Sequence, residues 1–548
     1  MTVLSQRENT NALSPRSKTA GEVRDALLER REIAMLDVRE EAFHAEGHPL
    51  FAANLPLSRI ELDAYARLPR RSVPIVLFDH GEGLALLASK RLISLGYTDV
   101  SLLEGGLEGW RDAGYEVFRD VNSASKAFGE LVEALLRTPS LSAQQVKELI
   151  ESKADVVIVD ARRFDEFQTM SIPTAVSAPG GELVYRLRGL EERPTTRVIV
   201  NCGGRTRSII GAQSLINAGL PNPIAALRNG TIGWKLAHQQ LDHGASRRAP
   251  KPDKRTSERA AIAARQLADA VGVRRILLDE LHRLRVDCEV TTYLFDVRTP
   301  EEYAAGHLPT SCNAPGGQLV QETDMFAPVR GAHLVLFDDD GTRANMTASW
   351  LAQMAWKVHV VDGIKNEDLW SVDRLENAPD LPPIPEGSQI GASALHRWIQ
   401  QDNSNSSRIV VLDFSRSREY RKGHIPGSWF ALQSRIDEAL LATEHSHAYV
   451  VTAREEAAAY LAFRDLRSAT EKPVYLLAGT PTTWEASGYT LASVDAKFAS
   501  QPVDYYRRPY EGIDASPESM QAYLDWEYGL IEQLDRDGTH GFRVFCPA

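Results

Sequence analysis

The sequence has few cysteines, no long apolar run and no long basic run. Its 548 residues include only four cysteines, and they lie too far apart for a disulfide framework or a close-spaced zinc motif: Cys202, Cys288, Cys312 and Cys546. No stretch approaches the roughly 20 apolar residues of a membrane span. The formal net charge of −12 makes nucleic acid and anionic membranes poor partners. We therefore expect a cytoplasmic protein with neither kind of partner.

One spacing recurs four times along the chain. A predicted strand ends in an acidic residue in each copy, at Asp37, Asp160, Asp296 and Asp413. A second strand end follows 42 residues later in the first three copies and 39 residues later in the fourth, at Asp79, Cys202, Asp338 and Thr452. A tryptophan comes 31 or 32 residues after that, at Trp110, Trp234, Trp370 and Trp484. The spacing predicts four like domains, of which only the second has a cysteine at this position.

Each repeat predicts an α/β domain. Short apolar runs alternate with longer segments of helical period, which is typical of βα units around a mostly parallel sheet. The predicted domains span residues 14–120, 138–244, 257–375 and 388–494, and a C-terminal tail spans residues 495–548. Residues 243–260 and 376–388 are charged or proline-rich and predict linkers. The tail is aromatic-rich, so we expect it to pack on a domain or on a neighbouring subunit.

A second internal match links the second and third domains. Residues 177–184 read SAPGGELV, and residues 313–320, which lie 136 positions later, read NAPGGQLV. The third domain is therefore a copy of the second in which Asp338 replaces Cys202. The consecutive acids from Asp338 to Asp340 predict a solvated loop rather than a metal site. We expect the domains without the cysteine to shape a cleft or an oligomer interface.

Residues 198–212 combine an apolar strand, a turn rich in glycine and arginine, and a helix that begins near Ser208. The main-chain N–H groups of such a turn form an anion-binding concavity, and Gly203 and Gly204 permit close approach of a substrate. Positive charge near a thiol lowers its pKa below the roughly 8.5 of a free cysteine. The turn therefore predicts that Cys202 is a nucleophile, in preference to an inert cysteine at a buried strand end.

These motifs resemble the rhodanese family of sulfurtransferases. The resemblance rests on the strand end Asp160-x-Arg162, on the six-residue loop from Cys202 to Arg207, and on residues 227–234, which end at Trp234. It implies four tandem domains, each a doubly wound, five-stranded parallel sheet with helices on both faces. It also implies a persulfide on Cys202 as the reaction intermediate, and neither a metal nor a cofactor.

The resemblance also assigns roles to residues. Cys202 would take the outer sulfur of thiosulfate, and a thiophilic acceptor such as cyanide, a thiol or a protein would then collect it. The substrate-binding loop would comprise Gly203, Gly204, Arg205, Thr206, Arg207 and Ser208, supported by Asp160, Arg162 and Trp234. We expect Arg205 to contact the anionic donor, whereas Arg207 either does the same or forms a structural ion pair.

Two other functions stay open at this point. A persulfide carrier or scaffold would relay sulfur from Cys202 without independent turnover, as the three domains without the cysteine suggest. The second open function is that of a cysteine-dependent phosphatase or an arsenate-reductase-like enzyme. Loop length disfavours it, because the related phosphatases have five residues between cysteine and arginine, whereas four separate Cys202 from Arg207.

Overall fold

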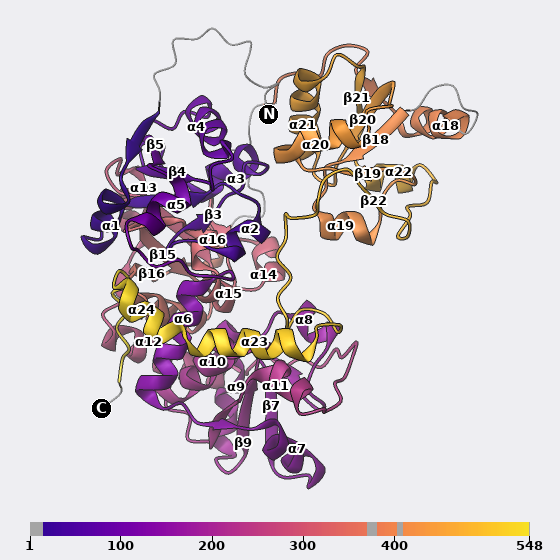
Figure 1. Cartoon of the computed structure of the whole chain (residues 1–548). Coiled ribbons are helices and arrows are strands. Elements are labelled where there is room, and N and C mark those ends of the chain that lie inside the picture. The colour runs from indigo at the N-terminus through magenta and orange to yellow at the C-terminus, as the bar shows by residue number, and fades with distance from the viewer. Residues whose placement is uncertain (1–14, 370–380, 403–408, 547–548) are drawn as a thin grey trace.

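The computed structural model describes residues 15–369, 381–402 and 409–546, so the predicted tryptophan at position 370 lies outside the described residues. Within these ranges the chain forms four α/β domains, each around its own sheet, and a C-terminal tail (Figure 1). The central strands of each sheet are apolar and parallel, as expected for strands covered by helices on both faces. No helix of the described ranges has the length and hydrophobicity needed to span a membrane.

The first domain has parallel strands in the order β1-β5-β4-β2-β3. Its strands are β1 (Arg16–Lys18), β2 (Ile33–Asp37), β3 (Ala53–Asn54), β4 (Ile75–Phe78) and β5 (Val100–Leu103). Its helices are α1 (Ala20–Leu28), α2 (Glu41–Glu46), α3 (Ile60–Arg67), α4 (Leu84–Ser94) and α5 (Gly106–Asp112).

The second domain has five parallel strands in the order β6-β10-β9-β7-β8. Its strands are β6 (Ser140–Leu141), β7 (Val156–Asp160), β8 (Val176–Ser177), β9 (Arg197–Asn201) and β10 (Ile224–Leu227). Its helices are α7 (Ala143–Glu151), α8 (Phe164–Thr169), α9 (Leu183–Leu187), α10 (Thr206–Asn217) and α11 (Gly230–Leu236).

The third domain repeats this strand order as β11-β16-β15-β12-β13. Its strands are β11 (Arg274–Ile276), β12 (Thr292–Asp296), β13 (Cys312–Asn313), β14 (Val329–Arg330), β15 (His333–Phe337) and β16 (Lys357–Val361). Its helices are α12 (Lys254–Ala270), α13 (Leu278–Val286), α14 (Pro300–Ala305), α15 (Gly316–Gln321), α16 (Thr323–Phe326) and α17 (Arg343–Gln353). Strand β14 leaves its own sheet and pairs antiparallel with β2 of the first domain.

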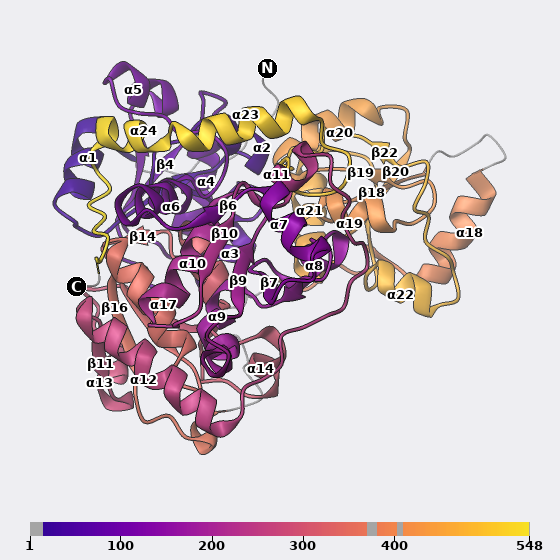
Figure 2. The ribbon, with the colours of Figure 1, turned by 90° about the horizontal axis from the view of Figure 1, so that it is seen from below.

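The fourth domain has six strands in the order β17-β21-β20-β18-β19-β22 and stands to one side of the other three (Figures 1 and 2). Its strands are β17 (Gln389–Ile390), β18 (Ile409–Asp413), β19 (Trp429–Phe430), β20 (Ala448–Thr452), β21 (Val474–Leu477) and β22 (Lys497–Phe498). Its helices are α18 (Ala392–Asp402), α19 (Ser417–Lys422), α20 (Ile436–Ala442), α21 (Glu456–Ala469) and α22 (Pro481–Ala486).

Two helices lie between the predicted domains. Helix α6 (Ser123–Leu136) joins the first and second domains and packs against α10. Part of the predicted linker at residues 243–260 is helical instead, because α12 begins at Lys254, where the side chain of Asp253 caps it. The alanine-rich face of α12, which includes Ala260 and Ala264, is buried against α9 and α17, and this burial explains the helix. The second predicted linker lies partly outside the described residues.

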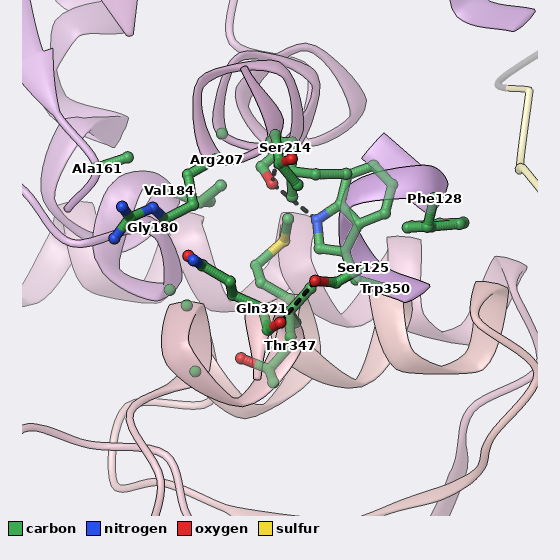
Figure 3. Close-up of a pocket in the computed structure, with 18 residues that line it drawn as sticks. Ser125, Phe128, Ala161, Gly180, Val184, Arg207, Ser214, Gln321, Thr347 and Trp350 are labelled. Atoms are coloured by element: carbon green, nitrogen blue, oxygen red, sulfur yellow. Dashed lines mark hydrogen bonds between the residues drawn. The ribbon is translucent and has the colours of Figure 1, made fainter. Parts of the chain in front are cut away.

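The repeated glycines bring the second and third domains together. A Cβ atom built on Gly181 would lie 2.8 Å from the main-chain nitrogen of Gly317. The two copies of the SAPGG-like segment therefore touch each other, backbone to backbone. Nearby, Trp350 Nε1 of α17 donates a hydrogen bond to Ser214 Oγ of α10 at 2.8 Å, beside a cavity of about 40 Å³ (Figure 3). The internal match thus marks an interface as well as a duplication.

Candidate active site

The loop that carries Cys202 runs from the end of β9 to the start of α10, two residues before the predicted start of the helix. The carbonyl oxygens of Cys202 and Gly203 accept hydrogen bonds of 2.8 and 3.0 Å from the N–H groups of Thr231 and Ile232 in α11. In a trans peptide the N–H group points opposite to the carbonyl. The N–H groups of Gly203 and Gly204 therefore point away from α11. Among the described residues, no group accepts a hydrogen bond from either of them.

The equivalent loops of the first and third domains are filled by their own carboxylates. Asp79 accepts hydrogen bonds from the N–H groups of Gly81 and Ala85, both at 2.9 Å. Asp338 accepts them from Gly341 at 3.0 Å and from Ala344 at 2.8 Å. The N–H groups of this loop are therefore directed so that they can donate to an oxygen acceptor within the loop. The acids of the third domain are not simply solvated, as the sequence had suggested, because they bind N–H groups of their own loop.

The side chain of Cys202 is buried, with 1% of its surface exposed. Its Sγ atom lies 3.4 Å from Ser208 Oγ. Burial raises the pKa of the thiol above its ordinary value, although Arg207 and the hydrogen bonds of Ser208 act in the opposite direction. The expectation of a lowered pKa is therefore wrong for this closed structure. The reason is that the loop is sealed from water, which disfavours the thiolate.

Arg207 forms a structural ion pair, one of the two roles expected of it. Its guanidinium donates two hydrogen bonds, of 2.8 and 2.9 Å, to the carboxylate of Glu166 in α8. Although burial opposes ionisation, Arg207 lowers the pKa of Glu166 to about 2. The third domain has the same pair, since Arg343 binds Glu302 at 2.6 Å, and both residues lie 136 positions after their counterparts. The pair therefore anchors this loop to the preceding helix in both domains.

Arg205 is held by acidic side chains of α6, which differs from the substrate contact expected of it. Its guanidinium makes two hydrogen bonds of 2.7 Å to Glu130 of α6 and also pairs with Glu133. The ring of Tyr528 lies 4.1 Å from it, and the side chain is 4% exposed. The acceptors come from α6, which the sequence reading had not assigned. Thr206 likewise contacts α6, because a Cβ atom on Gly129 would lie 2.8 Å from its methyl carbon.

Asp160 and Arg162 support the strand end that precedes the loop. Arg162 makes two hydrogen bonds to Asp160, of 2.9 and 2.7 Å, and a third, of 2.6 Å, to the carbonyl of Met170. Asp160 also accepts a 2.7 Å hydrogen bond from Asn201, the residue before Cys202. The buried pair therefore fixes the end of the strand that presents the thiol.

The predicted tryptophans close their domains. Trp234 is 2% exposed, and its Nε1 donates to the carbonyl of the residue six positions later, Gln240, at 2.7 Å. Trp110 and Trp484 donate to Glu116 and Thr490, which lie the same distance ahead. These side chains pack in the core. Trp234 therefore supports its domain, and the structure records no contact between Trp234 and Cys202.

The C-terminal tail covers the cysteine loop. Its helices α23 (Pro517–Tyr528) and α24 (Leu530–Asp537) lie across α11 and α6 (Figure 1). A Cβ atom on Gly203 would lie 2.7 Å from the ring of Tyr510, and one on Gly204 would lie 3.1 Å from Tyr523 and 3.2 Å from Glu527. Gly203 is thus required by close approach, and Gly204 leaves little room for a side chain. The sequence predicts that the tail packs on a domain or on a neighbouring subunit, and the structure shows it packed on a domain of the same chain.

The tail residues over the loop were not identified from the sequence. Tyr510, Tyr523 and Glu527 lie more than 300 positions after Cys202, and no local pattern connects them to it. The only available signal was the aromatic composition of the tail. Glu166 was missed as well, although its repeat as Glu302 at the 136-residue spacing could have indicated it.

A larger cavity, of about 440 Å³, lies beside the loop at the meeting point of all four domains and the tail. Arg207 and Tyr510 line it on the side of the loop. No group of acidic, histidine and cysteine residues in the described part of the chain is arranged to hold a metal ion. The fold and this loop define a multidomain α/β protein in which, among the described domains, only the second carries a cysteine in the loop.

Comparison with known proteins places the chain in a family. The pattern of the Rhodanese-like domain matches residues 19–113, 142–237 and 277–364, so the fourth domain lies outside the matched regions. A thiosulfate sulfurtransferase from Pseudomonas aeruginosa has a similar crystal structure: it is 55% identical, the match covers 96% of this chain and 99% of that chain, and the TM-score is 0.92. The chain belongs to the rhodanese-like family.

Other similarities are partial. A protein of Anabaena sp. is 26% identical over 19% of this chain and 83% of its own, with a TM-score of 0.18. A protein of Rhodopseudomonas palustris, described as a possible tyrosine phosphatase, is 26% identical over 21% of this chain and 91% of its own, with a TM-score of 0.19. No curated protein matches the chain.

Proposed function

We propose that the protein is a thiosulfate sulfurtransferase that works through a persulfide on Cys202. The observation that carries the proposal is the contrast between the loops. Carboxyl oxygens accept hydrogen bonds from N–H groups of the first and third loops, whereas the N–H groups of Gly203 and Gly204, beside a thiol, have no acceptor among the described residues. The similarity to the Pseudomonas aeruginosa enzyme over almost the whole chain supports the same activity.

The reaction has two steps. The Cys202 thiolate attacks the outer sulfur of thiosulfate, the sulfur–sulfur bond of the donor breaks, and sulfite leaves with the electron pair. The open N–H groups of the loop stabilise the negative charge on the resulting persulfide. A nucleophilic acceptor such as cyanide or a thiol then attacks the outer sulfur, and the bonding electrons return to Cys202 as a thiolate. Arg207, held by Glu166, maintains a positive field beside the loop.

Some features of the setting belong to the same proposal. The sparse use of cysteine supports a cytoplasmic location, since reducing compartments disfavour disulfides. A protein acceptor, or a role as a persulfide carrier with slow turnover, would use the same first step.

Replacing the nucleophile tests the proposal. Cys202→Ser should reduce thiosulfate:cyanide sulfur transfer to background and leave the circular dichroism spectrum unchanged, because Ser forms no persulfide. Cys288→Ser is the matched control, since Cys288 is exposed and belongs to the third domain. Sulfur transfer that persists in Cys202→Ser would contradict a single catalytic cysteine.

A further inference from the structure

The cavity beside the loop is lined by all four domains and the tail, including the three domains that lack the loop cysteine. Its lining includes Glu41 from the first domain, Glu322 from the third, and Arg416, Arg418 and Lys422 from the fourth. Its volume of about 440 Å³ lies in the range of pockets for organic ligands, roughly 300–1,000 Å³. Cyanide and sulfite are far too small to require such a space.

The cavity borders the cysteine loop at one point. Tyr510 lines the cavity and also lies against Gly203, where a Cβ atom would be 2.7 Å from its ring. Arg207, the last residue of the loop, lines it as well. A rotation of the Tyr510 side chain would therefore connect the cavity with the thiol.

The walls carry charges of both signs that form no close ion pair with a described residue. Arg416, Arg418 and Lys422 lie on or next to α19, and none of them forms an ion pair of 4.0 Å or less with a described residue, although Arg418 lies over the ring of Tyr505 and acts on the charge of Glu511. Glu41 and Glu322, from other domains, form no ion pair of 4.0 Å or less with a described residue, although Arg508 lies near enough to interact with both charges. Other charges of the lining are paired with each other, such as Arg508 with Glu511 at 2.6 Å.

Buried polar atoms in the same wall lack hydrogen bonds too. Gln321 Oε1, Asp504 Oδ1 and Arg508 Nε belong to lining residues and have no hydrogen-bond partner within the described structure. Leaving such groups unsatisfied is costly, so a polar occupant would stabilise the wall. A molecule with charges of both signs fits these walls better than an apolar molecule or a simple anion.

We propose that this chamber binds the sulfur acceptor, and that the acceptor is a thiol of amino-acid or short-peptide type with both carboxylate and ammonium groups. The proposal rests on the proposed sulfur transfer and names the acceptor class of that site. The cations of the fourth domain bind the carboxylates, and the carboxylates of the first and third domains bind the ammonium group. The fourth domain thus has a binding role.

The transfer step needs no other reactant. The acceptor thiol loses its proton to solvent, and its sulfur attacks the outer sulfur of the Cys202 persulfide. The bond between that sulfur and Cys202 Sγ breaks, and its electron pair regenerates the Cys202 thiolate. The product is the persulfide of the acceptor, so the transferred sulfur needs neither an oxidant nor a reductant.

A single-turnover experiment tests the acceptor class. Protein first loaded with sulfur from thiosulfate is mixed with reduced glutathione, with 2-mercaptoethanol or with cyanide, and the loss of the persulfide is timed. We expect glutathione to react faster than 2-mercaptoethanol at equal thiolate concentration. The triple Gln variant combines Arg416→Gln, Arg418→Gln and Lys422→Gln. In this variant the rate constant for glutathione, divided by that for cyanide, should fall about tenfold. A change of about tenfold corresponds to the loss of one charge-assisted hydrogen bond.

Arg421→Gln is the matched control, because Arg421 lies on the same helix and is absent from the cavity lining. It should leave the ratio of rate constants unchanged. An equal rate for the two thiols, or an equal effect of Arg421→Gln, would overturn the proposal.

A binding measurement separates this proposal from the proposed function. S-methylglutathione, which cannot accept sulfur, should bind the Cys202→Ser protein in a calorimetric titration, and the triple Gln variant should weaken that binding. If no binding is found while the unmodified protein transfers sulfur to cyanide, the chamber proposal is wrong and the sulfurtransferase proposal stands. Failure of cyanide transfer together with intact binding would overturn the proposed function alone.

Discussion

At the scale of single residues, one position determines whether a domain of this protein can carry sulfur. Asp79 and Asp338 place carboxyl oxygens on the N–H groups of their loops, so each of these loops is already occupied by its own side chain. In the second domain, the N–H groups of Gly203 and Gly204 have no hydrogen-bond acceptor among the described residues. The loop of the second domain can therefore receive the charge of a persulfide or of a bound donor.

The reactivity of Cys202 should depend on pH in a way that reflects its burial. Because burial raises the pKa of the thiol, its alkylation by iodoacetamide should reach half-maximal rate at a pH above the roughly 8.5 of a free cysteine. Tyr510→Ala should lower this midpoint and speed the reaction, since water would reach the sulfur. Labelling of Cys202 in peptide digests gives the rates, with the exposed Cys288 as an internal control. A midpoint below that of a free thiol would contradict the closed loop.

At the scale of elements, the sequence was informative wherever a pattern is local or repeated. Neighbouring residues predict β7, β9 and the turn after Cys202. The match between residues 177–184 and 313–320 is visible because the sequence itself repeats. Helix α6 and the covering tail could not be derived in this way, because their contacts with Arg205 and with Gly203 join distant parts of the chain. The unforeseen pairing of Arg205 with α6 and the raised pKa of Cys202 both follow from these two elements, which the sequence did not reveal.

The loop of the third domain offers a test at this scale. In a Cys202→Ser background, Asp338→Cys alone should give almost no thiosulfate:cyanide transfer, since Asp339 and Asp340 would raise the thiol pKa and repel the donor. Replacing residues 338–344 by the sequence of residues 202–208 should restore a measurable fraction, because Arg343 already occupies the place of Arg207 and its partner Glu302 is present. Equal rescue by the single substitution would show that the charge of the loop does not silence this domain.

At the scale of the whole molecule, domains without the cysteine complete the site that one domain carries. The third domain packs on the second through the paired glycines, the fourth lines the chamber, and the tail closes the loop. Four copies of one fold have thus taken different roles.

The interface between the second and third domains predicts unequal effects at two adjacent glycines. A Cβ atom on Gly181 would lie 2.8 to 3.1 Å from main-chain atoms of Gly316 and Gly317, whereas one on Gly180 would have its nearest contact at 3.7 Å. Gly181→Ala should therefore destabilise the protein by about 1–3 kcal/mol through overpacking. Gly180→Ala should stay within about 0.5 kcal/mol. Urea unfolding followed by tryptophan fluorescence measures both, and equal midpoints would contradict the close contact.

The central claim is that Cys202 carries the sulfur, and mass spectrometry after incubation with thiosulfate tests it most directly. The account predicts that the intact protein gains the mass of one sulfur atom, that peptide mapping places it on Cys202, and that cyanide removes it. The Cys202→Ser protein should gain nothing. A sulfur located on another cysteine, or an unmodified Cys202 that instead takes a phosphoryl group from a phosphate ester, would contradict the account.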